Sequence, residues 1–154
     1  MKAFLKRSSH NKGFTLMEVL IVLAIIAILA ALLIPTLIGY VDIANENSCL
    51  VECRYFVTAA QTLVTERYTN HTLDEITNDI QENTTEFLTE CFVLSELDVN
   101  GAIPSYRKAN VVIGNDGRIK DVTYTDGYCT CIYTQGSFEV TEGIQTFAAG
   151  VSFG

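Results

Sequence analysis

Histidine is scarce in this chain of 154 residues, and a glycine-rich phosphate-binding loop is absent. Of the two histidines, His10 lies in a basic N-terminal stretch, which leaves only His71 in the rest of the chain. No polar cluster around a general base is visible, and an active site needs such a cluster. We therefore expect no enzymatic activity, no catalytic residue, no metal and no cofactor.

Charged residues are missing from a run of 23 residues, Val19–Val41. An uncharged apolar run of this length can cross a bilayer as an α-helix. A secretory signal peptide would have a shorter apolar core followed by a small-residue cleavage site, and no such site follows here. Four basic residues and no acid lie in the first thirteen positions, ahead of the run, so the N-terminus should stay in the cytoplasm and the domain beyond the run should be exported.

Basic residues are also few beyond the first thirteen positions. Four of the ten lie within those positions: Lys2, Lys6, Arg7 and Lys12. Without this stretch, six basic residues would face 18 acidic ones, a formal net charge of −12. Such a surface repels nucleic acid phosphates. General nucleic-acid binding is therefore not expected.

Glu18 is an acid at the edge of the apolar run. Moving a carboxylate towards the bilayer centre costs roughly 2.5–3.5 kcal/mol on insertion scales. One interpretation is that Glu18 lies at the level of the lipid headgroups and begins the helix, where the helix dipole favours an acid. The residues around Glu18 suggest a second interpretation.

The segment Lys12–Glu18, KGFTLME, closely resembles the prepilin processing motif, basic residue–Gly–Phe–Thr–Leu–x–Glu. This motif is typical of type IV pilins, type II secretion pseudopilins and competence pseudopilins. The resemblance implies that a membrane prepilin peptidase cuts between Gly13 and Phe14 and methylates the new N-terminus at Phe14. It divides the chain into three parts: a removed leader (1–13), a transmembrane and assembly segment (14–41) and an exported pilin-like domain (42–154).

Cleavage would give Glu18 a partner. The Phe14 amine would be a cation beside lipid and Glu18 an anion, and both are unfavourable there unless they are paired. In an array of parallel spans, Glu18 of one subunit can meet the Phe14 amine of a neighbour, which favours assembly and sets the axial stagger. Pro35 removes a backbone donor inside the span. It either kinks the helix or, as the resemblance implies, lets it unwind where the filament packs.

Beyond residue 40 the apolar residues recur every three or four positions, which places them on one helix face. They are Cys49, Cys53, Phe56, Val57, Ala60, Leu63 and Val64. Charged residues such as Glu52 fall largely elsewhere. We expect one helix from about Phe14 to Tyr68. Two shorter helices should follow, one over 73–82 that opens with a capping box and one from about 84 to 97.

From Lys108 onward, short apolar runs are separated by turn signals. The turns are Asn115-Asp116-Gly117, Asp126-Gly127 and Gln135-Gly136. They predict three to four antiparallel strands joined by hairpins. The expected fold is therefore α+β: a long N-terminal helix, transmembrane in its first half, packed on a small antiparallel sheet. The pilin resemblance implies the same architecture.

The five cysteines suggest a covalent link. Cys49 and Cys53 share the inward helix face, and Cys129 and Cys131 share one face of a strand. An exported domain permits disulfides, so we expect at least one bridge from the helix or Cys91 to Cys129 or Cys131. Because five is odd, at least one thiol stays free or pairs between subunits. Free buried thiols are one alternative, and a four-cysteine zinc site is another, although its spacings are not those of zinc ribbons.

Two sets of charged residues invite a ligand interpretation. The first is three acids near the sheet turns: Asp116, Asp121 and Asp126. No continuous calcium loop exists, so we interpret them as turn-forming and solvated. The second is the basic residues that cluster in the sequence of the exported part: Arg107, Lys108, Arg118 and Lys120. We interpret them as a solvated face and not as a DNA-binding patch.

These features together predict a structural subunit of a type IV pilus-like filament. The precursor should be a single-pass protein of the bacterial cytoplasmic membrane, and the assembled form should be extracellular. Expected partners are other pilins in a homo- or hetero-oligomeric filament, the prepilin peptidase, the pilus assembly platform and the membrane. The alternatives are a minor pseudopilin of a type II secretion or DNA-uptake system, an adhesive or DNA-binding module displayed on a filament, and a plain single-span protein whose leader mimics the motif.

Overall fold

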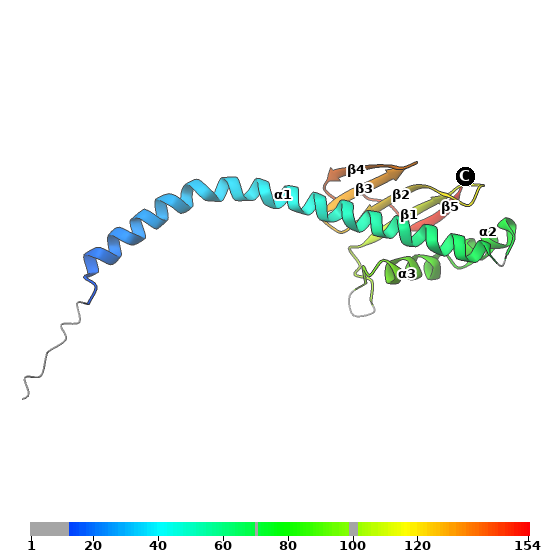
Figure 1. The fold of residues 1–154 in the computed structure, drawn as a ribbon, viewed down its shortest axis with the longest axis horizontal. Helices are drawn as coiled ribbons and strands as arrows, with labels where there is room; N and C mark the ends of the chain where they lie inside the picture. Colours follow the sequence, from blue (N-terminus) through cyan, green and yellow to red (C-terminus); the bar gives the residue numbers. More distant parts are fainter. Residues whose placement is uncertain (1–12, 70, 99–101) are drawn as a thin grey trace, which may run out of the picture. The chain divides into compact units, whose positions relative to one another are not determined.

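The computed structural model describes residues 13–69, 71–98 and 102–154 (Figure 1). Its first regular element is helix α1 (Leu16–Tyr68). The chain divides into two compact units, Met1–Tyr40 and Val41–Gly154, and α1 contributes to both. The predicted helix from about Phe14 to Tyr68 is confirmed, with its start two residues later. Residues 1–12 of the predicted leader lie outside the described residues.

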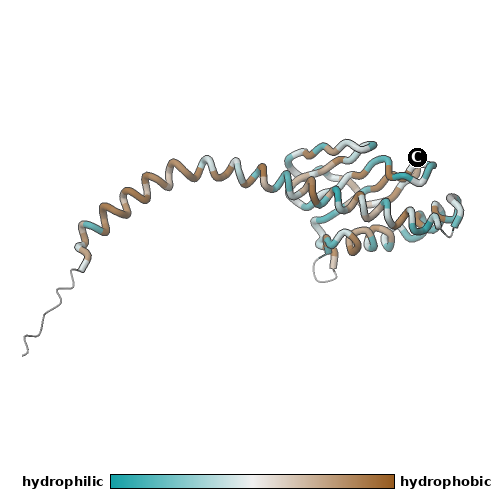
Figure 2. The backbone as a smooth tube through the Cα atoms, in the orientation of Figure 1, coloured by the Kyte–Doolittle hydropathy of each residue, from teal (hydrophilic) through white to brown (hydrophobic). Residues whose placement is uncertain are grey.

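The first unit contains the apolar run of α1. Its large apolar side chains between Val19 and Tyr40 are 46–70% exposed, and Figure 2 colours most of this stretch of helix as hydrophobic. Pro35 lies inside this helix, which continues beyond it. Of the described helices, α1 is the one that is long and apolar enough to cross a membrane.

In the second unit, α1 buries one face. The buried residues recur at helical spacing and are Cys49, Cys53, Phe56, Ala59, Ala60 and Val64, in close agreement with the predicted face. Helix α2 (Leu73–Glu82) follows with the predicted bounds. Its capping box is also confirmed, because the Glu75 carboxylate accepts a hydrogen bond from the Thr72 backbone N–H at 3.0 Å.

Helix α3 (Thr84–Leu94) ends three residues before the predicted end near Leu97. The reason is Glu96, whose φ of 57° lies in the left-handed region and stops the helix. The Leu97 backbone N–H then donates to the Phe92 carbonyl at 3.0 Å, which satisfies one of the last carbonyls of the helix. As a result the chain turns back and buries Leu97 in the core.

Five strands form one sheet in the order β4-β3-β2-β1-β5. They are β1 (Lys108–Ile113), β2 (Ile119–Thr125), β3 (Cys129–Thr134), β4 (Ser137–Glu142) and β5 (Gly150–Phe153). The α+β class is confirmed, but the prediction of three to four antiparallel strands is wrong by one strand. Strand β5 has four residues and pairs parallel to β1, so no hairpin turn signals it in the sequence.

Two turns of the sheet depend on unusual backbone conformations. Gln135 and Gly136, between β3 and β4, both have positive φ, 46° and 97°, as in a two-residue hairpin turn that matches strand twist. Gly117, between β1 and β2, has a φ of 73° and lies against α1. A Cβ at this position would come within 2.1 Å of the Tyr68 ring, so only glycine fits.

The core of the second unit lies between the three helices and one face of the sheet (Figure 1). Alternate residues of β1 point into it: Ala109, Val111 and Ile113. Three aromatic rings meet at its centre. The ring centroid of Phe56 in α1 is 4.9 Å from that of Phe92 in α3 and 5.8 Å from that of Tyr124 in β2. Helix α1 is therefore held by contacts to both α3 and the sheet.

Candidate functional site

The first candidate site is the start of α1. Gly13, Phe14 and Thr15 precede the helix and have no regular structure. Phe14 is 86% exposed, and a Cβ on Gly13 would meet nothing within 4 Å. The bond that we predict to be cut therefore lies in exposed, non-helical chain, which is the kind of segment that proteases cut.

Glu18 caps this helix. Its Oε2 atom accepts hydrogen bonds from the Thr15 backbone N–H at 2.8 Å and from the Thr15 hydroxyl at 2.9 Å. In return, Thr15 Oγ1 accepts a hydrogen bond from the Glu18 backbone N–H at 3.2 Å. The two residues form a capping box, so within the single chain Glu18 has the helix-start role. Sequence reasoning missed Thr15, although the Thr-x-x-Glu spacing signals this box.

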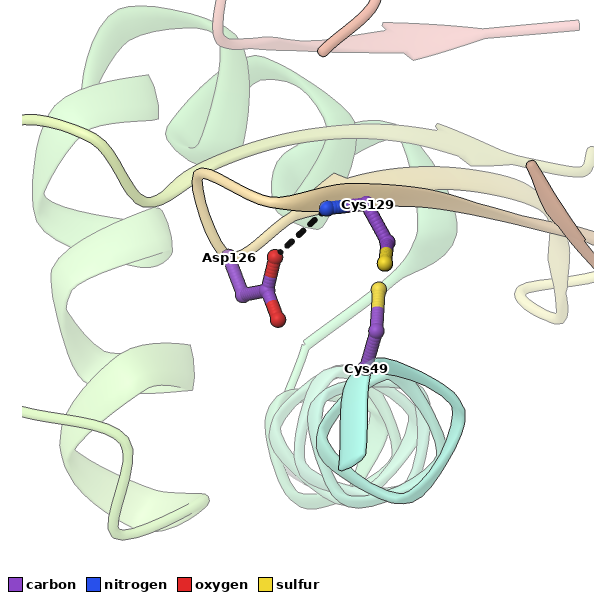
Figure 3. Close-up of side chains that lie close together, drawn as sticks. All are labelled: Cys49, Asp126 and Cys129. Atoms are coloured by element: carbon purple, nitrogen blue, oxygen red, sulfur yellow. Dashed lines mark hydrogen bonds between the residues drawn. The ribbon is translucent and has the colours of Figure 1, made fainter. Parts of the chain in front are cut away.

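The second candidate site brings four of the five cysteines together. Cys49 and Cys53 lie on the buried face of α1, Cys129 and Cys131 lie on β3, and each is at most 4% exposed. The sulfur atoms of Cys49 and Cys129 are within 4.8 Å of each other, and Figure 3 shows them pointing toward one another. The thiols of Cys53 and Cys131 also lie close enough to shift each other's pKa, upward for Cys53 and downward for Cys131.

Helix and strand present these thiols at matching intervals. Residues four apart on a helix are about 6 Å apart along its axis, and residues two apart on a strand are about 7 Å apart. Cys49 therefore faces Cys129 while Cys53 faces Cys131. Cys91 lies apart on α3, where burial raises the pKa of its thiol to about 12. All five are thiols here, so the expected disulfide stays a prediction.

Asp126 lies beside the first of these cysteine pairs (Figure 3). Its Oδ1 atom accepts hydrogen bonds from the backbone N–H groups of Tyr128 at 2.8 Å and Cys129 at 2.9 Å, so it forms the turn before β3, as predicted. The prediction that Asp126 is solvated is wrong, because these contacts bury it to 9% exposure. Burial and then the charge of Asp126 raise the pKa of the Cys49 thiol, and the same two causes act on Cys129. Both thiols therefore stay protonated at neutral pH.

A metal could meet three donor atoms here. One carboxylate oxygen of Asp126 and the sulfur atoms of Cys49 and Cys129 lie within 4.8 Å of one another. In the part of the chain that the structure describes, this is the only group of such donors that is close enough. Cys53 and Cys131 are not part of it, so the four-cysteine zinc site considered from the sequence is not assembled. Three donors without a fourth protein ligand differ from a closed structural zinc site.

Glu52 joins α1 to the sheet, although the helical pattern places it outside the buried face. Its carboxylate lies 2.9 Å from the Arg107 guanidinium and accepts a hydrogen bond from the Tyr124 hydroxyl at 2.5 Å. Arg107 also donates to the Leu97 carbonyl. Burial and then this contact with Glu52 raise the pKa of Tyr124. The expectation for Glu52 is wrong because its partners lie more than 50 residues away, where helical periodicity gives no signal.

The predicted basic cluster is dispersed, so the solvated-face interpretation fails for part of it. Arg107 is engaged with Glu52, and its side chain is only 15% exposed. Lys108 begins β1, whereas Arg118 and Lys120 lie at the opposite end of the β1–β2 ladder. Lys120 donates to the backbone carbonyl of Gly154 at 2.8 Å. These four residues therefore form no continuous basic surface for nucleic acid.

Comparisons with known proteins concern the first site. Residues 8–34 match the family model of the prokaryotic N-terminal methylation motif. A stretch of 38 residues is 66% identical to the type IV wide pilus major component PilA4 of Thermus thermophilus. That match covers 25% of this chain and 29% of the relative. No solved structure matches the chain. The resemblance to the type IV pilin family is thus confirmed for the N-terminal segment.

Proposed function

We propose that this chain is a structural subunit of a type IV pilus-like filament. It is cleaved between Gly13 and Phe14, N-methylated at Phe14 and polymerised through the first half of α1. The observation that carries the proposal is the coincidence of three features in one segment. A methylation motif spans residues 8–34, the Gly13–Phe14 bond is exposed, and the helix that follows leaves its apolar side chains uncovered.

The uncovered apolar surface of α1 supports assembly. Soluble monomers rarely expose contiguous apolar patches larger than a few hundred Å². Every large apolar side chain from Val19 to Val41 is exposed within the single chain. Lipid covers this surface in the precursor, and neighbouring copies of the helix cover it in the filament. The prepilin peptidase, the assembly platform and the membrane are the partners that this pathway requires.

The geometry of Glu18 also supports assembly. Both hydrogen bonds that the Glu18 carboxylate accepts use Oε2, and among the described residues Oε1 has no partner. Cleavage creates a cationic amine at Phe14, at nearly the same depth in the membrane. The Oε1 atom of one subunit binds this amine on a neighbour, while Oε2 continues to cap its own helix. Pairing removes two isolated charges from a lipid environment, and that energy favours the assembled state.

A structural role within the filament is the function that the known relative best supports, because that protein is named as a major pilus component. No contact in the described residues favours a minor pseudopilin or a displayed adhesive module. The dispersed basic residues give no support to DNA binding. We assign no catalytic role to the chain.

Processing tests this proposal. We expect surface material to begin at Phe14 and to carry one extra methyl group, as measured by N-terminal sequencing and intact mass. A Gly13→Val variant should accumulate as an uncut membrane precursor, because a β-branched side chain at the cut stiffens the backbone that glycine leaves free to enter the peptidase. Its exported domain should still fold. A surface protein that retains residues 1–13 would overturn the proposal.

A further inference from the structure

We propose that Cys49 is bonded to Cys129 and Cys53 to Cys131 in the exported chain. These two disulfides, here called the disulfide ladder, fasten α1 to β3. Cys91 remains a free buried thiol. The proposal requires an oxidising compartment and in that respect rests on the proposed export of this domain.

The spacing of the four residues selects this pairing. Cysteines joined by a disulfide usually have Cα atoms about 4.4–6.8 Å apart, as a general range. Cys49 and Cys53 lie one helical turn apart on the same face, and Cys129 and Cys131 lie about 7 Å apart on one strand. A diagonal pair would add a shift of about 6–7 Å along the elements to the distance between them. Only the two facing pairs bring sulfur close to sulfur.

The packing of the core also favours bridges over four independent thiols. A free cysteine acts as a small apolar residue, so alanine or valine could fill any one of these positions. Core packing alone does not require two separate contacts, each between a sulfur atom of the helix and a sulfur atom of the strand. The interaction of Cys53 with Cys131, which shifts the pKa of both thiols, agrees with this second sulfur contact.

The chemistry is thiol–disulfide exchange with an external disulfide, either a protein oxidant or a small molecule such as oxidised glutathione. A thiolate of the chain attacks the external disulfide and forms a mixed disulfide, releasing one thiol of the oxidant. The facing cysteine then attacks the chain sulfur of the mixed disulfide and releases the second thiol. For each bridge the chain loses two protons and two electrons, and the external disulfide gains them. Two bridges consume two equivalents of oxidant.

The alternative to the disulfide ladder is a metal ion bound by Cys49, Cys129 and Asp126. Such a site would engage only one of the two facing pairs and would leave Cys53 and Cys131 unexplained. The Asp126 carboxylate already accepts two backbone hydrogen bonds within its turn. The ladder accounts for all four facing thiols, so we favour it over the metal.

The consequence for a filament subunit follows from where the bridges lie. Helix α1 both polymerises and carries the exported domain, and both bridges fall on its buried face. With the ladder closed, force applied to α1 reaches the sheet through covalent bonds and not through packing alone. Reduction should therefore lower the Tm of the exported domain by roughly 10 °C or more.

The test is a thiol count on the full chain, purified in detergent from exporting cells without reductant. Free thiols are alkylated in denaturant and the intact mass is measured. We expect one adduct per chain, at Cys91, and five adducts if the sample is reduced first. Cleavage after Glu52 then separates Cys49 from Cys53, and each fragment should remain linked to the β3 peptide until reduction.

Two double variants test the pairing with the same number of substitutions. Cys49→Ser with Cys129→Ser removes one facing pair and should leave one bridge and one free thiol. Cys49→Ser with Cys131→Ser leaves Cys53 and Cys129, which do not face each other, and should leave three free thiols. The wild-type count needs no variant and stands even if a double variant fails to fold.

Other outcomes would either contradict the disulfide ladder or show that the ladder and the proposed function stand or fall independently. Five thiols in surface material that begins at Phe14 would contradict the ladder and leave the filament role intact. Five thiols with one zinc ion per chain, measured by metal analysis, would replace the ladder with the metal site. The pairing would be refuted if the variant that keeps Cys53 and Cys129 formed as much disulfide as the variant that keeps Cys53 and Cys131. Both bridges in a chain that retains residues 1–13 would support the ladder while overturning the proposed processing.

Discussion

The two halves of α1 differ in where their apolar side chains go. In the first half, Leu29 is 54% exposed and its apolar neighbours are exposed to a similar degree on every side of the helix. In the second half, Phe56 is fully buried, and charged or polar residues occupy most of the outer face. Figure 2 shows the change in colour along one continuous helix. The chain therefore contains one apolar surface that it covers by itself and one that it leaves uncovered.

This difference separates folding from assembly. A helix that is apolar on all sides cannot be covered by a small domain packed on one side. A helix with one apolar stripe can be covered in this way, and here α3 and the sheet cover it. Substitutions in the second half should therefore change the stability of the domain. Substitutions in the first half should change assembly and leave the free energy of unfolding nearly unchanged.

The largest difference should come from a matched pair of truncations. Phe56→Ala removes a ring packed against Phe92 and Tyr124 and should lower the free energy of unfolding by about 3–5 kcal/mol. Leu29→Ala removes an exposed side chain and should change it by less than about 0.5 kcal/mol. Denaturant unfolding in detergent measures both. Similar losses in the two variants would show that the first half contributes to the fold of the domain.

A smaller loss should follow from breaking the contact between Glu52 and Arg107. Arg107→Ala leaves Glu52 without its cation and should lower the free energy of unfolding by roughly 2–3 kcal/mol, less than for a fully buried pair because both side chains are partly exposed. The control is Arg118→Ala, since Arg118 is 83% exposed and its 3.9 Å ion pair should contribute less than about 0.5 kcal/mol. Equal effects of the two substitutions would mean that the Glu52 contact does not hold α1 to the sheet.

A further effect, visible only at alkaline pH, should be a pH dependence at Cys91. Burial raises its pKa from 9.0 to about 12. A folded-state pKa above the unfolded value gives stability that is fully present below about pH 9 and is lost as the pH rises towards about 12. Cys91→Ala has no such group, so the stability advantage of wild type over the variant should shrink between about pH 8 and about pH 11. A constant difference would mean that this thiol ionises equally well in the folded and unfolded chain.

Much of the fold is predictable because its signals are local. The helical spacing from Cys49 to Val64 marks the buried face, and Thr72 with Glu75 marks the start of α2. Turn residues mark the ends of the first four strands. At the first candidate site, the motif from Lys12 to Glu18 is contiguous in sequence, so it is visible without any structure.

The remaining features depend on contacts between distant segments. Strand β5 exists because β1 offers it a parallel partner about 40 residues away along the chain. The inward position of Glu52 depends on Arg107, and the facing of Cys49 with Cys129 depends on the register of α1 over β3. Local periodicity indicates which residues are buried, but only the packed elements determine which of them meet. For this reason the sequence limits the possible cysteine pairings but does not select one of them.

The central claim is that the Glu18 charge, and not only its cap, drives assembly. Three variants separate the two roles. Glu18→Gln keeps a side chain that suits the capping box and removes the charge. Glu18→Ala removes both. Thr15→Ala keeps the charge and weakens the cap by about 1 kcal/mol.

The measurement compares the membrane pool, the fraction cut at Gly13 and the yield of sheared filaments for these variants and wild type. Membrane pool and processing should stay near wild type in all three. Filament yield should fall about tenfold or more in both Glu18 variants, because an incoming subunit loses its pairing with the Phe14 amine, and should stay near wild type in Thr15→Ala. Normal filaments from Glu18→Gln, together with a loss in Thr15→Ala, would mean that Glu18 acts only as a helix cap and that its charge does not drive assembly.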